Sequence, residues 1–210
     1  MPLDNYSGDT FVAFVDVSGF KELMKHEEKA SAALNNFYTA GYEILQENRA
    51  IQGLFVSDCA ILFVNSNEPL GIRLTMMLKV VNEMNRRMLQ YDMMLTTSIA
   101  FGPFSYHQRL EFQGIEKNPV IGNAYLAAYL DNANGTPKIQ PGQCRILRNN
   151  IDEQLLLQNP LLQTEGKYTC YYWMVDSADG IPHFRNNYAD AYQLKYRGML
   201  EAIKGHRGRV

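Results

Sequence analysis

The chain has 210 residues, of which 46% are hydrophobic and 20% are charged, and its formal net charge is -2. This length suits one domain spanning residues 1–210, with a sizeable core. The near-neutral charge excludes the broad positive field on which general nucleic-acid binding depends. The longest apolar runs fall far short of the roughly 20 residues of a membrane-spanning helix, and the polar residues 1–10 do not form a secretory signal. We therefore expect a soluble, cytoplasmic protein with neither a membrane nor a nucleic-acid partner.

The first half of the chain shows strand and helix patterns in succession. A β-branched and aromatic run predicts a strand at Phe11–Val17, followed by a tight turn at Ser18-Gly19 and a helix-compatible stretch at Phe20–Lys29. Apolar residues at steps of three and four predict a helix over Ser31–Asn48. Two apolar runs separated by two residues predict a β-hairpin of Ile51–Val56 and Cys59–Val64 with Asp58 at its tip.

The second half continues with a helix over residues 68–90 and a strand at Leu95–Phe101, ended by Gly102-Pro103. Further along, the patterns predict a hairpin partner for that strand, a short helix, a loop with two prolines, two more strands and a last helix: Tyr106–Gln113, Gly122–Leu130, Gly135–Gly142, Gln143–Leu147, Thr169–Val175 and Asn186–Ile203. The three cysteines lack CxxC spacing, which argues against a disulfide framework and a structural zinc site.

This element order does not alternate as a doubly wound sheet requires. It suits an α/β (α+β) fold with a ferredoxin-like, mostly antiparallel sheet and helices on one face. The helices over residues 31–48 and 68–90 are expected to cover one face, because their apolar spacing demands burial.

Two aspartates are the main candidates for chemistry. Asp16 lies near the end of a buried strand, before a turn suited to anions, and Asp58 lies at the hairpin tip. Carboxylates on neighbouring strands can hold divalent cations such as Mg²⁺ or Mn²⁺. The alternative is that Asp16 is a turn or N-cap residue and Asp58 an ordinary hairpin residue.

Four motifs, in order over roughly residues 10–135, resemble the class III nucleotidyl cyclase catalytic domain. They are the first strand with its metal turn, the hairpin of the second aspartate, the strand ending in glycine and the entry to the last active-site helix: Phe14–Phe20, Leu54–Phe63, Thr97–Gly102 and Val120–Leu130. The resemblance implies the class III cyclase fold. It also implies two metal ions held by Asp16, Asp58 and the Val17 carbonyl, and a triphosphate held by Ser18, Gly19, Phe20 and Lys21.

Three positions depart from the purine-specific cyclases. Leu54 stands where they carry a base-reading lysine, Pro119 where they carry a base-reading aspartate, and Ser57 where the family has a glycine. Ser57 and the stretches 122–129 and 137–145 resemble the Pycsar anti-phage cyclases, which make cyclic CMP or cyclic UMP. The resemblance thus implies a pyrimidine triphosphate as substrate and a base pocket of Leu54, Ser57, Pro119, Asn123, Tyr125 and Tyr129.

The helix slots that usually hold an asparagine and a transition-state arginine contain Leu126 and either Tyr129 or Leu130. The cation that would replace this arginine stays open among Lys21, Arg109, Lys138 and Arg145.

The leading interpretation is an enzyme that converts UTP or CTP to the 3',5'-cyclic monophosphate and pyrophosphate by two-metal catalysis. By resemblance it is a homodimer with shared active sites, and it makes a second messenger in anti-phage defence that a separate effector protein reads. The alternative is a degenerate cyclase domain that binds a nucleotide or a partner without turnover; the missing arginine favours it and the paired aspartates oppose it. A third hypothesis, a single-stranded RNA platform built on Phe55, Phe63 and Phe101, is opposed by the acidic balance.

Overall fold

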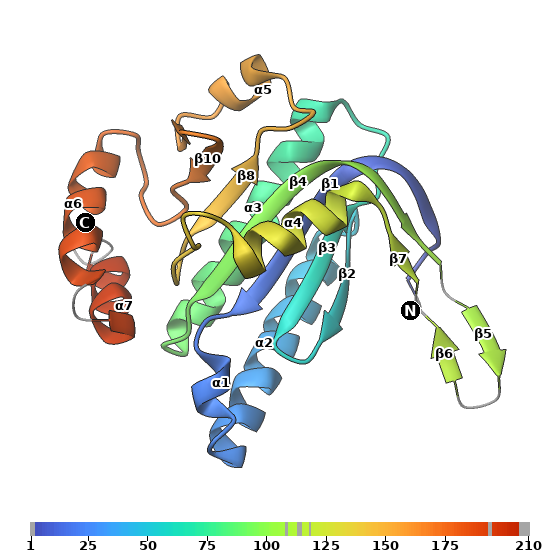
Figure 1. Ribbon diagram of the computed structural model, residues 1–210, viewed down its shortest axis with the longest axis horizontal. Helices are drawn as coiled ribbons and strands as arrows, with labels where there is room; N and C mark the ends of the chain where they lie inside the picture. The colour runs from blue at the N-terminus through green and yellow to red at the C-terminus, as the bar shows by residue number, and fades with distance from the viewer. Residues whose placement is uncertain (1–2, 108, 113–114, 118, 193–194, 206–210) are drawn as a thin grey trace.

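A mixed β-sheet organises the molecule (Figure 1). The computed structural model describes residues 3–107, 109–112, 115–117, 119–192 and 195–205. Within these residues the sheet has eight strands, in the order β2-β3-β1-β4-β8-β10-β9 with β7 paired to β4. Their bounds are β1 Tyr6–Val17, β2 Ile51–Val56, β3 Cys59–Val64, β4 Leu95–Tyr106, β7 Val120–Ile121, β8 Cys144–Leu147, β9 Leu162–Glu165 and β10 Tyr168–Tyr171.

The strand β1 lies inside the sheet, antiparallel to β3 on one side and to β4 on the other. The only parallel pair described is β4 with β8, so the predicted, mostly antiparallel sheet is confirmed. The hairpin β2–β3 has the predicted bounds. Its register places Val56 opposite Cys59, which leaves Ser57 and Asp58 as the two turn residues.

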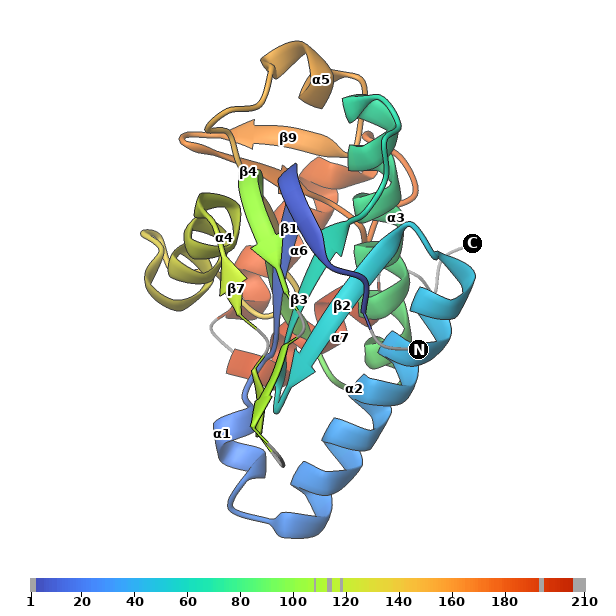
Figure 2. The ribbon, with the colours of Figure 1, turned by 90° about the vertical axis from the view of Figure 1, so that its right-hand side faces the viewer.

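Helices cover both faces of the sheet (Figure 2). The helices α2 (Glu27–Glu47) and α3 (Leu70–Gln90) lie on one face, as predicted. The expectation of helices on one face alone is wrong, because α4 (Asn123–Asn134) covers the other. The residues of β1 alternate accordingly: Phe11, Ala13 and Val15 join the core under α2 and α3. Val12 and Phe14 join a second core with Ala124 and Ala128 of α4. The uninterrupted apolar run of β1 therefore follows from burial on both faces.

Two predictions around β4 are wrong. Gly102-Pro103 does not end this strand, because the first residues of β1 pair with it as far as Tyr106 opposite Tyr6. The stretch predicted as its hairpin partner instead divides: residue 106 belongs to β4, and β5 (Arg109–Phe112) pairs with β6 (Ile115–Lys117) in a separate two-stranded sheet. Gln113 lies outside the described residues.

The last third differs most from the prediction. The strand expected at Thr169–Val175 ends at Tyr171, and the helix expected from Asn186 to Ile203 is two helices, α6 (Gly180–Tyr192) and α7 (Lys195–Gly205). The helix α5 (Glu153–Leu157) and the strand β9 have no counterpart in the prediction. The helix α4 continues four residues beyond its predicted end, and a short helix α1 (Phe20–Leu23) follows the first turn. Within the described part of the chain, no helix is both long and apolar enough to cross a bilayer.

Candidate metal and nucleotide site

The two predicted aspartates come together at one end of the sheet. Asp16 is the next-to-last residue of β1 and pairs with Cys59, the first residue of β3. Asp58 directly precedes Cys59, and its carbonyl oxygen accepts a hydrogen bond of 2.9 Å from the Val17 N–H. Asp16 near the end of β1 and Asp58 in the turn before β3 are therefore neighbours at this end of the sheet.

The electrostatics of this pair are those of two carboxylates held close together. Burial first, and then the negative charge of Asp58, raise the pKa of Asp16 from 3.8 to about 6, and the positive charge of Lys138 opposes this rise. A cation bound between the two aspartates would reverse this penalty, because it stabilises the ionised form.

The donor set also fits a hard divalent cation, since carboxylate and carbonyl oxygens are the ligands that Mg²⁺ and Mn²⁺ prefer. The described residues contain no cluster of three or more His, Cys, Asp and Glu side chains that could hold a metal ion. Ions at Asp16 and Asp58 would therefore take their remaining ligands from main-chain oxygens such as that of Val17, from water and from a substrate.

The turn after β1 has the shape that its glycine permits. Gly19 has a φ of 79°, in the left-handed region, and it directly precedes α1, whose first residue Phe20 is buried in the core. The Ser18 N–H donates to the Met94 carbonyl at 2.9 Å, so this amide of the turn expected to suit anions is not available to one. Lys21 is exposed.

The candidate base-pocket residues are only partly brought to the aspartates. Tyr125 and Tyr129 of α4 stack with ring centroids 6.1 Å apart, and Tyr129 meets Phe14 of β1 edge-on at 5.3 Å. Cys59 lies close enough to Tyr125 to contribute, after burial and Tyr129, to the raised pKa of Tyr125. These two tyrosines therefore lie over the strands that carry Asp16 and Asp58.

The hairpin contributes two further candidates. Leu54 is half-buried in β2 and faces Ile61 across the hairpin, on the α4 side of the sheet. Ser57 has a φ of 54°, a left-handed conformation that glycine adopts most readily. This is the turn position at which the resembled family has its glycine.

Pro119 does not join this group within the chain. It precedes β7, which pairs with residues 105 and 106 of β4, whereas Asp16 pairs with Thr96 at the other end of the same strand. Asn123 starts α4 as an exposed residue, next to Gly122, which lies against Pro103 and Phe104. The shared pocket implied by the resemblance is thus not assembled by one chain.

The structure also distinguishes the candidate cations. Arg145 is 3% exposed, its guanidinium lies 3.2 Å from the Asp131 carboxylate and donates to the Pro137 carbonyl at 2.6 Å, so it is a structural residue away from solvent. Lys138 is exposed, and its charge acts on Asp16. The side chain of Arg109 lies outside the described residues. Lys138 is therefore the cation candidate whose charge reaches the aspartate pair.

The aromatic platform proposed for RNA is not present. Phe63 is fully buried, and the half-buried Phe55 and Phe101 pack against Phe37 at 5.2 Å and Phe11 at 5.0 Å. These rings serve the core and cannot stack on bases.

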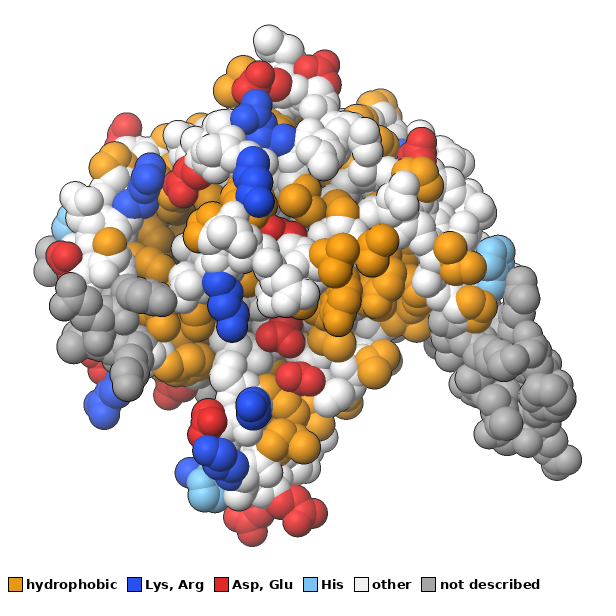
Figure 3. All heavy atoms as spheres, in the orientation of Figure 1, with side chains coloured by type: hydrophobic (Ala, Val, Ile, Leu, Met, Phe, Trp, Pro, Cys, Tyr) orange, Lys and Arg blue, Asp and Glu red, His pale blue; other side chains and the backbone are white. Residues whose placement is uncertain are grey.

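Figure 3 shows hydrophobic side chains gathered over α4 and the strands beside it, next to the acidic end of the sheet. The exposed members on α4 and just before it are Leu126 at 50%, Tyr129 at 40%, Leu130 at 46% and Ile121 at 62%. We call these four residues the α4 patch. A patch of this kind on a protein surface marks an interaction site more often than a chance exposure.

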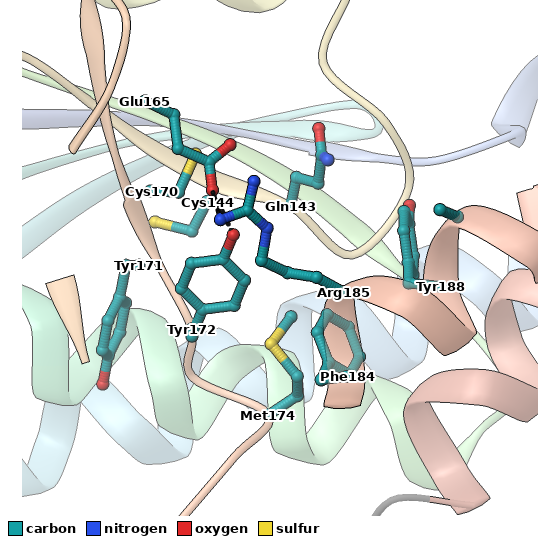
Figure 4. A pocket seen from close by; sticks show the side chains of 11 residues that line it. Gln143, Cys144, Glu165, Cys170, Tyr171, Tyr172, Met174, Phe184, Arg185 and Tyr188 are labelled. Atoms are coloured by element: carbon teal, nitrogen blue, oxygen red, sulfur yellow. Dashed lines mark hydrogen bonds and ion pairs between the residues drawn. The ribbon is translucent and has the colours of Figure 1, made fainter. Parts of the chain in front are cut away.

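A cavity of about 200 Å³ lies apart from this site, among β8, β10 and α6 (Figure 4). Tyr172 donates to the Glu165 carboxylate, which also lies 3.5 Å from the guanidinium of Arg185. Neither Asp16 nor Asp58 lines this cavity, so it is not where the sequence predicted chemistry.

Solved structures share this architecture. The adenylyl cyclase CyaB from P. aeruginosa superposes with a TM-score of 0.56 at 15% identity, over 80% of this chain and 94% of that one. The guanylate cyclase domain of RhGC from Catenaria anguillulae, solved with GTP, gives 0.58 at 15% identity over 80% and 95%. The dimeric guanylyl cyclase domain of RhoGC from Blastocladiella emersonii gives 0.59 at 11% identity over 80% and 97%. The chain has the class III nucleotidyl cyclase fold.

The structure alone establishes the cyclase fold, because no family model and no curated protein matches this chain in sequence.

One contact at the site could not be predicted from the sequence. The ring of Tyr196 in α7 lies against Gly19 of the turn in this cyclase fold. No sequence signal could have found it, because nothing in the spacing links the last helix to the first turn.

Proposed function

We propose that this chain is a nucleotidyl cyclase that converts UTP or CTP to its 3',5'-cyclic monophosphate and pyrophosphate. The observation that carries the proposal is that Asp16 and Asp58 lie next to each other at one end of the sheet of a cyclase fold. Two carboxylates held close together repel each other, which destabilises the fold. A bound metal ion or a shared proton relieves this repulsion, so such a pair indicates metal or proton chemistry.

Each residue then has a role. Asp16, Asp58 and the Val17 carbonyl would hold two Mg²⁺ or Mn²⁺ ions, which would supply charge neutralisation of the triphosphate and activation of the ribose 3'-hydroxyl. The turn of Ser18, Gly19, Phe20 and Lys21 would hold the triphosphate through its main chain after Ser18 and through the exposed Lys21, because the Ser18 N–H is bound to the Met94 carbonyl and the Phe20 side chain is buried. Lys138 stabilises the negative charge that develops on pyrophosphate as it leaves.

The pyrimidine preference rests on side chains that cannot form hydrogen bonds. Leu54 and Pro119 stand where purine cyclases would present a lysine and an aspartate, so a purine edge loses its partners here. Ser57, Asn123, Tyr125 and Tyr129 are the remaining pocket residues able to hydrogen-bond a pyrimidine.

We infer that the working form is a homodimer. The α4 patch leaves large apolar side chains in solvent on the face of the sheet that α4 covers, and a second copy of this chain would bury it. Pro119 and Asn123 lie toward the other end of β4 from Asp16, so they reach a nucleotide at the aspartates only across such an interface. The similar domain from Blastocladiella is described as a non-canonical dimer in one structure and, as a double mutant, as a monomer in another.

The deciding experiment incubates the purified chain with each of the four ribonucleoside triphosphates and Mn²⁺, and identifies the products by mass. Asp16→Ala and Asp58→Ala should each abolish product while leaving the fold intact. The control is Asp9→Ala, which removes an exposed carboxylate from the same strand β1. Cyclic AMP or cyclic GMP as the main product would refute the pyrimidine preference, and full activity of Asp58→Ala would refute the two-metal mechanism.

Shared sites are tested by mixing. A chain with Asp58→Ala and a chain with Asn123→Ala and Tyr129→Ala are each expected to be inactive alone. Mixed dimers should recover about one working site each, because every mixed dimer contains one intact half-site from each chain. Mixed dimers that form but show no recovery would contradict the shared site.

The second candidate is a degenerate cyclase domain that binds a nucleotide without turnover. It is favoured by one observation: the slots of the usual asparagine and arginine hold Leu126 and Tyr129 or Leu130, and Arg145 is buried in an ion pair. Triphosphate binding without product from any of the four nucleotides would support it over the cyclase.

The proposed biological role is second-messenger synthesis in anti-phage defence, with the product read by a separate effector protein. Cells carrying the chain and its effector should resist phage, and Asp16→Ala should remove that resistance. Protection that persists in Asp16→Ala would separate the role from cyclisation.

A further inference from the structure

The last helix, α7, is fastened to the start of β4. The Tyr196 hydroxyl accepts a hydrogen bond of 3.0 Å from the Met94 N–H and donates one of 3.4 Å to the Asp92 carbonyl. Nearer the end of α7, Lys204 forms an ion pair with the Asp92 carboxylate. Two side chains of α7 therefore hold the three residues that lead into β4.

The same tyrosine also reaches the turn after β1. A Cβ atom placed on Gly19 would lie 3.6 Å from the Tyr196 ring, which is ordinary van der Waals contact, so the ring lies against the turn backbone. Met94 connects the two contacts, because its N–H binds Tyr196 and its carbonyl accepts the Ser18 N–H at 2.9 Å. The peptide groups of Met94 thus link α7 to the turn.

This linkage continues to the aspartates. The residue before Ser18 is Val17, whose N–H binds the Asp58 carbonyl at 2.9 Å, and Asp16 comes directly before it. Displacement of Met94 or of the Tyr196 ring would therefore shift the backbone at Ser18 first and then the positions of Asp16 and Asp58.

The turn has little other support on this side. A cavity of about 470 Å³ lies beside Ser18 and Gly19, and Tyr91, Met93 and Tyr196 line it as well. The Ser18 hydroxyl is buried and makes no hydrogen bond within the described residues. Because empty space borders the backbone here, few neighbouring atoms oppose its movement, and the Tyr196 ring is one of the contacts that do.

We propose that Tyr196 is a positioning residue for the triphosphate turn, through which the C-terminal helix α7 sets the affinity of this site for nucleoside triphosphates. The inference rests on the proposed function, since it takes the turn of residues 17–20 as the triphosphate site. Tyr196 is not a catalytic residue, because it touches the turn and not the substrate. If the competent form of the turn becomes a minor population, the apparent triphosphate affinity falls by the same fraction.

The test compares Tyr196→Phe with Tyr172→Phe. The first keeps the ring against Gly19 but leaves the Met94 N–H without its acceptor. The second removes a tyrosine hydroxyl that binds Glu165 and has no contact with the turn, so it is the matched control. Loss of one partner from an amide hydrogen bond typically changes an equilibrium by about tenfold.

Two readouts are measured on each purified variant. The first is the affinity for UTP and CTP relative to the affinity for UMP and CMP, in the presence of Mn²⁺. Tyr196→Phe should weaken triphosphate binding about tenfold and leave monophosphate binding within about twofold, whereas a merely destabilised fold would weaken both alike. The second is hydrogen exchange of the segment over residues 17–23, which should quicken about tenfold in Tyr196→Phe and stay unchanged in Tyr172→Phe.

The outcomes separate this inference from the proposed function. If the unaltered chain binds no triphosphate, the proposed function fails, and exchange over residues 17–23 still decides whether Tyr196 holds the turn. If the unaltered chain binds triphosphate and Tyr196→Phe binds it equally well with unchanged exchange, the inference is overturned. Tyr196→Ala, which removes the ring as well, should enlarge both effects; if it unfolds, the Phe variant alone gives the answer.

Discussion

Asp16→Asn should make the metal-free protein more stable at neutral pH. The pKa of Asp16 is raised from 3.8 to about 6, so the folded protein disfavours the ionised carboxylate that the unfolded chain accepts. Well below pH 3.8 the carboxyl is protonated in both states and imposes no cost. The cost grows as the pH rises from about 4 to about 6, because the unfolded state ionises first, and above about pH 7 it is complete.

The magnitude follows from the shift. About two pKa units correspond to about 3 kcal/mol, and because Asp16 is only half-buried, solvent screening lowers this to about 1–2 kcal/mol. Asparagine has nearly the same shape but no charge, so Asp16→Asn should recover that amount. For a chain of this size the thermal midpoint should rise by about 3–6 °C at pH 7.

The assay is thermal unfolding at pH 4, 5.5 and 7 in the presence of a chelator, followed by the same series with Mn²⁺. The gap between Asp16→Asn and the unaltered protein should grow with pH, and Mn²⁺ should close or reverse it, because a cation stabilises only the chain that has both carboxylates. Asp9→Asn, an exposed change on the same strand, should show neither effect. A gap at pH 7 that is absent, or equal to the gap at pH 4, would refute the electrostatic account of this pair.

Three further changes are predicted. Lys138→Met should lower the cyclisation rate about 100-fold with little change in thermal midpoint, since Lys138 is exposed and its charge acts at the aspartates; an unchanged kcat would remove Lys138 from the mechanism. Arg145→Met should cost about 3–5 kcal/mol in urea unfolding because it leaves the Asp131 carboxylate buried without its partner, and adding Asp131→Asn should restore part of the loss. Gly122→Ala should destabilise the protein by about 2 kcal/mol or more, because φ is 137° and a Cβ would lie 2.2 Å from the Pro103 carbonyl oxygen. A thermal midpoint within about 1 °C of that of the unaltered chain, as expected for a neutral change, would contradict this.

The parts of the fold that could be predicted are those whose pattern is local. The hairpin of residues 51–64 has its predicted bounds because two apolar runs separated by two turn residues admit one register. The helix α3 begins two residues later than predicted and ends where expected. The closeness of Asp16 and Asp58 followed in the same way, since Asp16 pairs with Cys59 and Asp58 directly precedes Cys59 in the turn.

What could not be predicted depends on distant partners. The apolar run over residues 172–175 is buried without being a strand, and a short apolar run does not reveal whether it is buried as a strand or as a loop. Gly102-Pro103 reads as a strand end, yet β4 continues because residues 6–10 supply its pairing partner. The place of Pro119 in a motif predicts that it belongs to the base pocket. The pairing of β7 with the far end of β4 shows that Pro119 and Asp16 lie at opposite ends of that strand within one chain.

The central place of β1 has a consequence during synthesis. Among the described strands β1 is synthesised first, yet its longest partner, β4, begins at Leu95, roughly 80 residues after β1 ends. At about 5–20 residues per second, one edge of a strand whose residues 11–15 are all apolar stays unpaired for roughly 4–16 seconds, even after β3 has joined the other edge. An exposed strand edge of this composition is prone to pair with other chains. We therefore expect the yield of native protein to depend strongly on chaperones and on slow expression at low temperature.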